Sequence, residues 1–161
     1  MDKQYYPVEI EEKWSKIWSE RVISNKDSDV SFSQVIPPPN VTGTLHMGHS
    51  FQYAIMDFYT RYHHMSGKDA HWQVGADHAG IATQMVVENN LAKNDVTRLD
   101  LGREKFLDEV WSWKDYSEEK ITSQIKRLGC SVDWNKYRFT LDDGCNEAVM
   151  KAFVELHRKN K

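Results

Sequence analysis

The sequence has little cysteine, little net charge and no long apolar run, and each shortage excludes a class of protein. Its two cysteines, Cys130 and Cys145, lack the C-x-x-C spacing of metal or redox sites and suit a reducing compartment, although a disulfide between them stays open. A net charge of −3 argues against a broad basic surface for nucleic acid. No apolar stretch approaches the roughly 20 residues of a membrane span, and no signal peptide follows Met1. We therefore expect a cytoplasmic globular protein.

Proline is also scarce, and three of the four prolines are consecutive, at residues 37–39. The preceding residues 31–36 read as a short buried strand. Prolines cannot donate ladder hydrogen bonds and do not continue a helix, so the chain must leave the sheet in extended form. After His49, apolar residues recur on one helical face, at Phe51, Ile55, Phe58, Tyr62 and Met65.

His46 and His49 therefore stand where a helix begins, just after the end of a strand. Free N–H groups and the positive end of the helix dipole favour phosphate there, although neither common glycine-rich phosphate loop is present. The phosphate site competes with two alternatives. A His-x-x-His pair can bind a metal, and it can be an ordinary helix start with surface histidines.

Gly67 is the expected C-terminal cap of the helix, and a second strand follows at 70–74. This strand–helix–strand order predicts the βαβ unit of a Rossmann-like sheet. The turn after this strand should lie beside the first turn, so Asp77 would face the same crevice as Asn40 and His46. Asp77 can pair with an ammonium group there, or it can cap the helix expected at 81–91.

The remaining pattern predicts three further helices, a connector and a turn. A helix within residues 1–23 begins near Pro7, and a polar connector covers 93–102. Helical spacing from 103 to 117 continues to Gly129, with Trp111 and Trp113 as core residues rather than base-stacking platforms. A turn at 142–144 precedes a helix at 146–157, whose inward residues would be Val149, Ala152, Phe153 and Leu156.

The motif His46-Met47-Gly48-His49 resembles the "HIGH" signature of class I aminoacyl-tRNA synthetases. Within that class, the flanking PPPNVTGTL and GADHAGIATQ are similar to the valyl-tRNA synthetases, and further matches cover nearly the whole chain. The resemblance implies an α/β fold, the first half of a Rossmann-like nucleotide-binding fold with parallel strands and flanking helices. It implies an amino-terminal helical segment at 1–30. Residues 31–161 would be the first half of the catalytic domain, ending near the start of the connecting and editing insertion.

The resemblance also implies a function and its residues. The family activates valine with ATP and Mg²⁺ and charges tRNA(Val), and its members are monomeric. Lacking the family's lysine-rich "KMSKS" loop, this chain alone would be a poor catalyst, and a half-sheet would leave an apolar helix face uncovered. The alternative is a non-catalytic nucleotide- or amino-acid-binding module. The matching positions are catalytic His46, His49 and Thr44; ATP-binding His46, Gly48, His49 and Gly75; and valine-binding Pro38, Asn40 and Asp77, with no metal ligand.

One departure and one open role accompany these matches. The family turn has threonine before the aspartate, where this chain has Ala76, so one hydroxyl is missing. The neighbouring His78 is either a residue that supports the site or a satisfied histidine.

Overall fold

The computed structural model describes residues 4–19 and 31–161. The chain divides into two compact units, and each is described by itself. The first unit contains residues 1–37, 44–74 and 119–136, and the second contains residues 38–43, 75–118 and 137–161.

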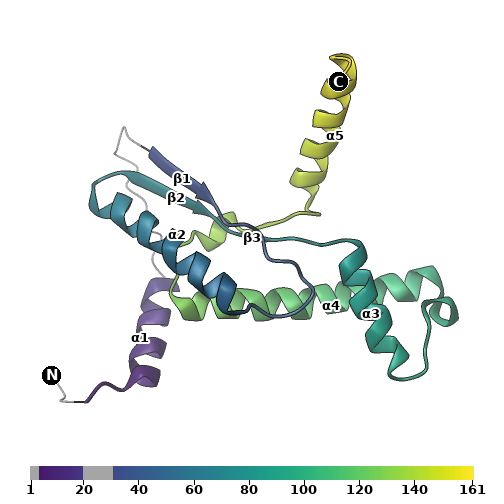
Figure 1. The fold of residues 1–161 in the computed structure, drawn as a ribbon, viewed down its shortest axis with the longest axis horizontal. Coiled ribbons are helices and arrows are strands. Elements are labelled where there is room, and N and C mark those ends of the chain that lie inside the picture. The colour runs from purple at the N-terminus through teal and green to yellow at the C-terminus, as the bar shows by residue number, and fades with distance from the viewer. Residues whose placement is uncertain (1–3, 20–30) are drawn as a thin grey trace. The chain divides into compact units, whose positions relative to one another are not determined.

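The first unit is built on a parallel pair of strands and a helix. β1 (Ser31–Val35) pairs with β2 (Asp69–Gln73), and α2 (Met47–Met65) connects them and lies along the strand pair (Figure 1). Tyr53 of α2 and Trp72 of β2 are at most 1% exposed, with ring centroids 6.4 Å apart, and form the centre of this core. The predicted strand–helix–strand unit is confirmed. The expectation that its first strand is buried is wrong, because β1 alternates between exposed and half-buried residues and Val35 is 68% exposed.

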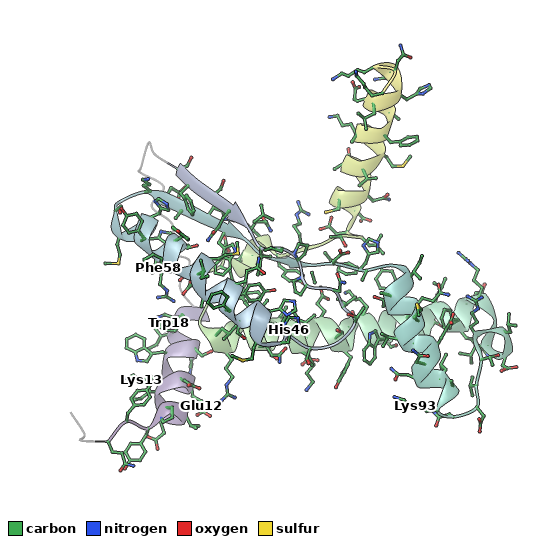
Figure 2. The ribbon with its side chains drawn as sticks, in the orientation of Figure 1. Glu12, Lys13, Trp18, His46, Phe58 and Lys93 are labelled. Atoms are coloured by element: carbon green, nitrogen blue, oxygen red, sulfur yellow. The ribbon has the colours of Figure 1, made fainter. Side chains whose placement is uncertain are left out.

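The apolar residues that define the helical pattern of α2 lie on its exposed side. Phe58, which projects from the helix in Figure 2, is 65% exposed, and Met65 is 89% exposed. The helix buries Tyr53 and Thr60 instead. An uncovered apolar helix face was expected of a half-sheet, and the described residues show one.

α1 (Pro7–Ser19) begins at Pro7, as predicted, while residues 20–23 of the expected helix lie outside the described residues. An aromatic and charged cluster joins three parts of the first unit. The Arg61 guanidinium lies 5.1 Å from the Trp18 ring centre, pairs with Asp57 at 2.6 Å and donates to the Gly129 carbonyl at 2.7 Å. Arg61 thus links α2 to α1 and to the loop after residue 128.

The second unit has its own short parallel pair, β3 (Gly75–Ala76) with β4 (Arg138–Phe139). α3 (Ile81–Ala92) follows β3, and α5 (Asp143–Arg158) follows β4. α4 (Arg98–Leu128) contributes its residues up to 118 here and the rest to the first unit, where η1 (Trp134–Lys136) also lies. None of the described helices combines the length and apolarity needed to cross a membrane.

The predicted connector at 93–102 is wrong in its second half, because α4 already begins at Arg98. Thr97 and Asp100 form a reciprocal cap: Asp100 accepts from the Thr97 N–H at 2.9 Å, and its own N–H donates to the Thr97 hydroxyl at 3.3 Å. Gly102 then kinks the helix with φ 73° and ψ 172°. Gly102, the last residue of the predicted connector, is thus a kink within the helical segment.

α5 forms, but its predicted inward face is not buried within the described chain. The face is exposed at Val149, Ala152, Phe153 and Leu156. An amphipathic pattern predicts a helix but does not supply the surface that covers it. The predicted turn is also corrected: Asp142 is the N-cap of α5 and accepts from the Cys145 N–H at 2.7 Å. Cys130 and Cys145 are both free.

Gly129→Ala should destabilise the chain more than Gly102→Ala. The two glycines have φ of 72° and 73°, so alanine costs each about 1–2 kcal/mol in backbone strain. At Gly129 a Cβ would also lie 2.6 Å from Cζ3 of Trp18, whereas Gly102 has open space. Overpacking should therefore add about 1–3 kcal/mol to the Gly129→Ala loss alone, measured as free energy of unfolding in urea. Equal losses would show that Trp18 does not pack here.

Candidate functional site

The proline loop continues the parallel pairing in the second unit. Asn40 forms a parallel bridge with Asp77. The Asp77 N–H donates to the Pro39 carbonyl at 2.8 Å, and the Val41 N–H donates to the Asp77 carbonyl at 2.9 Å. Pro39 cannot donate but can accept, so the pairing survives the prolines. The structure thus brings Asn40 and Asp77 together, while Pro38 is exposed in the same loop.

The two histidines of the first unit form a reciprocal cap on α2, at the end labelled His46 in Figure 2. The Gly48 N–H donates to Nδ1 of His46 at 3.1 Å, and the His46 N–H donates to Nδ1 of His49 at 3.2 Å. The ring centroids are 4.0 Å apart. These bonds satisfy free N–H groups of the helix start, a task that Ser, Thr, Asp or Asn usually performs.

This geometry fixes the tautomer of both rings. A nitrogen that accepts a hydrogen bond carries no proton, so Nδ1 is bare and Nε2 carries the N–H in each histidine. Burial, and secondarily the nearby His46, lowers the pKa of His49. His49 is therefore neutral near pH 7 and still has an N–H to donate. Two imidazole N–H donors beside a helix N-terminus suit an anionic oxygen.

Gly48 and Thr44 complete the histidine end. A Cβ on Gly48 would lie 2.9 Å from Cε1 of His46, so a larger residue would displace the ring that closes the cap. Thr44 is exposed. The residues fit a phosphate group because donors are present and Gly48 leaves the backbone open.

The carboxylate of Asp77 supports its own turn. Its Oδ1 accepts from the Ala79 N–H at 3.0 Å and from the Thr140 hydroxyl at 3.1 Å. The N-cap of α3 is Gly80, without a side-chain cap, so the alternative that Asp77 caps this helix is wrong. Ala79 has φ 53°, a left-handed conformation that is unfavourable for alanine. The Asp77 bond holds this turn, and the carboxylate remains 37% exposed.

Thr140 supports the Asp77 turn and is not among the residues predicted from the sequence. Its hydroxyl lies 3.1 Å from Oδ1 of Asp77, 2.5 Å from Nδ1 of His78 and 2.9 Å from the His78 amide nitrogen. All three contacts are satisfied when Thr140 donates to Asp77 and accepts both His78 N–H groups. His78 thus supports the Asp77 turn. Thr140 directly follows β4 and Asp77 directly follows β3, and these two strands are parallel neighbours. Their matching positions at the strand ends are the signal that could have identified Thr140.

Gly75 and Ala76 have structural reasons for their size. A Cβ on Gly75 would collide with the backbone carbonyl of Arg138. Ala76 is fully buried, and its carbonyl accepts from the Thr140 N–H at 3.2 Å. A threonine hydroxyl at position 76 would need a partner in this core. The close pairing of β3 and β4 explains Gly75 without any nucleotide.

The predicted site residues fall into two groups. Thr44, His46, Gly48 and His49 belong to the first unit, and Pro38, Asn40, Gly75 and Asp77 belong to the second. Each group is assembled within its own unit. The expectation that His46 shares a crevice with Asp77 stays a prediction.

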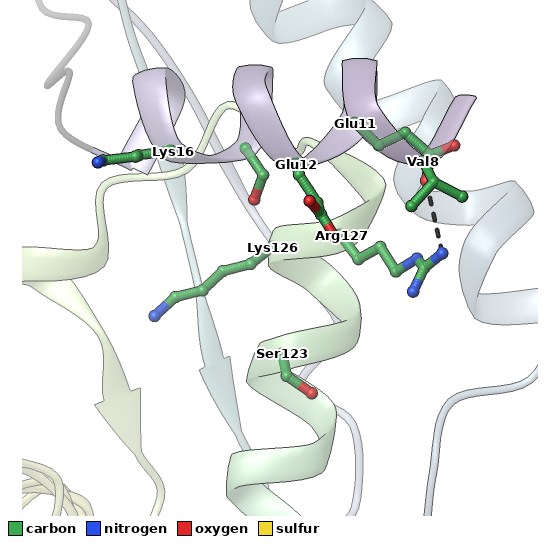
Figure 3. Close-up of a pocket in the computed structure, with 8 residues that line it drawn as sticks. Val8, Glu11, Glu12, Lys16, Ser123, Lys126 and Arg127 are labelled. Carbon is green, nitrogen blue, oxygen red and sulfur yellow. Dashed lines mark ion pairs between the residues drawn. The ribbon is translucent and has the colours of Figure 1, made fainter. Parts of the chain in front are cut away.

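A groove of about 510 Å³ lies elsewhere in the first unit, between α1 and the end of α4 (Figure 3). Glu11 and Arg127 pair across it at 3.5 Å, and it contains none of the predicted site residues. Acidic and basic side chains both line this groove, as is typical of a solvated boundary between two packed helices. Across the described ranges, no group of three or more His, Cys, Asp or Glu could hold a metal ion.

Comparison with known proteins identifies the family. The model of "tRNA synthetases class I (I, L, M and V)" matches residues 9–161. The chain belongs to the class I tRNA synthetases.

Among curated synthetases, the chain is similar to valine–tRNA ligases. It is 57% identical to that of Acinetobacter baylyi over 95% of this chain, 51% to that of Francisella tularensis over 98%, and 52% to that of Legionella pneumophila over 99%. The chain spans only 16–17% of the length of these relatives. The predicted resemblance to valyl-tRNA synthetases is confirmed.

The fold is also that of a class I synthetase. The LeuRS of Agrobacterium radiobacter K84 agnB2, solved in a ternary complex with tRNA and LeuAMS, matches 98% of this chain and 19% of its own with a TM-score of 0.74. At 21% identity the likeness concerns the fold alone. The predicted α/β half-fold with parallel strands is confirmed.

Gly75→Ala should destabilise the chain by about 1–3 kcal/mol or more, because its Cβ meets a backbone carbonyl that cannot rotate away. Gly43→Ala is the matched control, since its Cβ would meet nothing within 4 Å and its φ is not left-handed. Urea unfolding of both variants measures the difference. If Gly75→Ala is as stable as Gly43→Ala, close strand pairing does not explain this glycine.

His49 should make stability depend on pH. Because folding lowers its pKa, the unfolded chain binds the proton more readily, and stability falls as pH drops below the unfolded value of about 6.5. Glutamine in His49→Gln can accept the same His46 N–H without titrating. Unfolding measured between about pH 7.5 and about pH 5.5 should show a larger loss for the wild type than for His49→Gln. His63 and His64, whose pKa values are also lowered, are present in both proteins and cancel; parallel pH profiles would contradict the prediction.

Proposed function

We propose that this chain is part of a valine–tRNA ligase and carries the histidine side of its ATP site together with part of its valine pocket. The observation that carries the proposal is the 57% identity to a valine–tRNA ligase over 95% of the chain. Class I family membership and the paired histidine cap support it independently of that relative. The activity belongs to the whole ligase, of which this chain spans a small part.

The first step joins valine to ATP. The valine carboxylate attacks the α-phosphorus, a new O–P bond forms, and pyrophosphate leaves with the electrons of the broken P–O bond. The carboxylate is already ionised, so no general base is required, and catalysis must come from alignment and charge stabilisation. The Nε2–H groups of His46 and His49 would donate to phosphate oxygens, and Thr44 would add a hydroxyl. Gly48 would let the nucleotide approach, and Gly75 would lie beside it.

Valine would be held in the second unit. The exposed part of the Asp77 carboxylate would pair with the α-ammonium, and Asn40, its bridge partner, would bind a polar group of the substrate. Pro38 would form a rigid apolar wall. In the second step the acyl group passes to a ribose hydroxyl of tRNA(Val) and AMP leaves, through parts of the ligase outside this chain.

The remaining assignments follow from the same proposal. Mg²⁺ would enter with ATP, held mainly through its phosphates rather than by a protein cage. Residues 31–161 would form the first half of the nucleotide-binding domain and residues 1–30 a helical segment before it. The ligase would be a cytoplasmic monomer.

The test is valine-dependent exchange of pyrophosphate into ATP by the polypeptide as its cells make it. His46→Ala and His49→Ala should each lower kcat about a hundredfold or more, because the lost donors act on developing charge. Asp77→Asn should raise the KM for valine about tenfold or more, because it removes a charged partner. His157→Ala, on the exposed end of α5, is the control and should change neither constant.

Two outcomes would overturn the proposal. Exchange that is stimulated by another amino acid but not by valine would exclude a valine ligase. Tight binding of a valyl-adenylate analogue by the native polypeptide without any exchange would identify the non-catalytic module instead. The 161-residue chain by itself should exchange weakly, and its intact mass in the source cells shows whether it is made alone.

A further inference from the structure

One helix supplies neutral polar side chains to the backbone of the loop that carries the predicted site residues. In the first unit, Oε1 of Gln124 accepts from the Leu45 N–H at 2.9 Å. Leu45 immediately precedes His46, the N-cap of α2. The next N–H along the chain, that of His46, donates to His49. Two successive peptide N–H groups are therefore fixed by side chains at the histidine end.

The second unit has the same arrangement at the other end of the loop. Nε1 of Trp113 donates to the Val41 carbonyl at 2.9 Å, and the hydroxyl of Ser117 donates to the Gly43 carbonyl at 2.9 Å. Val41 is 0% exposed and Ser117 is 1% exposed, so water does not replace these bonds. Val41 follows Asn40, whose backbone pairs with Asp77.

The three side chains follow the helical repeat of α4. They are separated by four and by seven residues, which places them on one face of a helix. They contact alternate loop residues, 41, 43 and 45, at backbone atoms only. None has chemistry suited to adenylate formation. Backbone N–H and C=O groups in such a loop need hydrogen-bond partners, and side chains of α4 supply one at each of these three residues.

Resting on the function proposed above, we propose that Trp113, Ser117 and Gln124 are positioning residues of the synthetase reaction. Gln124 holds the peptide before His46, so that the imidazole donors meet the phosphate oxygens in the transition state. Trp113 and Ser117 hold the peptides after Asn40, so that the valine-binding residues keep their place. Loss of Gln124 therefore reduces kcat, whereas loss of the other two bonds raises the KM for valine.

The decisive test compares Gln124→Leu with Gln124→Glu in the native polypeptide. Leucine lacks an acceptor, whereas glutamate keeps one for the Leu45 N–H. Gln124→Leu should lower kcat for valine-dependent exchange about tenfold to a hundredfold, because misplacement of catalytic groups is costly, and should leave the KM for valine unchanged. Gln124→Glu should restore kcat to near the wild-type value. A Gln124→Glu protein as slow as Gln124→Leu, or a Gln124→Leu protein as fast as wild type, overturns the assignment.

Hydrogen exchange at the Leu45 amide provides a readout that does not need activity. Hydrogen exchange at this amide should be accelerated about fivefold or more in Gln124→Leu, whereas the amide should stay protected in Gln124→Glu. If the wild type lacks valine-dependent exchange of pyrophosphate into ATP, the proposed function fails. Hydrogen exchange at the Leu45 amide then still decides whether Gln124 holds the loop. Unchanged protection in a folded Gln124→Leu overturns the positioning role whatever the activity.

The second arm uses matched pairs on α4. Trp113→Phe keeps the ring but loses the N–H, and Ser117→Ala loses the hydroxyl. Each should raise the KM for valine about threefold to tenfold with kcat unchanged. Trp111→Phe and Ser112→Ala are the controls, at exposed positions two and five residues earlier, and should leave KM unchanged. Equal effects from control and test variants would overturn the assignment of Trp113 and Ser117.

Discussion

Three consecutive prolines limit the backbone hydrogen bonds of the loop that carries the predicted site residues, because proline has no N–H. Pro37, Pro38 and Pro39 cannot extend the β1 ladder as donors, so the chain leaves the strand pair with few of its own backbone partners. The pairing that remains uses the Pro39 carbonyl and the Val41 N–H, both with Asp77. Beyond Val41, side chains of α4 take over. An unpaired buried backbone group costs about 1–3 kcal/mol, more than a typical hydrogen bond contributes, so this supply of partners is a requirement of the fold.

The need for hydrogen-bond partners also links structure to chemistry at the start of α2. A serine or aspartate would cap this helix at least as well as histidine. Histidine does more because its ring has two nitrogens with different tasks. When Nδ1 of His46 and His49 accepts backbone N–H groups, Nε2 must carry the proton. The cap therefore sets the tautomer whose Nε2–H can donate to an anion.

The sequence predicted the local elements best, because their signals are local. Pro7 marked the start of α1, the prolines marked the end of β1, and the apolar pattern after His49 marked α2. The missed start of α4 also had a local signal, the reciprocal pair Thr97 and Asp100. The contacts of Trp113, Ser117 and Gln124 had none, since they join residues 72 to 79 positions apart. Helical spacing predicted core positions for Trp111 and Trp113, which is wrong for Trp111 because its side chain is 47% exposed. It also could not reveal the carbonyl that the Trp113 N–H meets.

The family resemblance identified candidate residues that spacing alone left ambiguous, but it did not explain why each residue has its type. Gly75 matches the family and is also required by the Arg138 carbonyl, so its presence is no evidence of nucleotide contact. Asp77 differs, because its bonds to Ala79 and Thr140 both use Oδ1 and leave the carboxylate partly exposed. The exposed part of the carboxylate therefore keeps hydrogen-bonding capacity beyond the turn that it stabilises.

The exposed side of α2 connects stability to the site. Helices in proteins gain most of their stability from packing of an apolar face, and α2 leaves Phe51, Phe58 and Met65 uncovered in the described chain. The histidine cap lies at the first turn of this helix, where fraying begins. Whatever covers the apolar face would therefore also hold the two imidazoles in their donor geometry. The geometry of the His46 and His49 cap therefore depends on packing further along the helix, at residues that take no part in the cap.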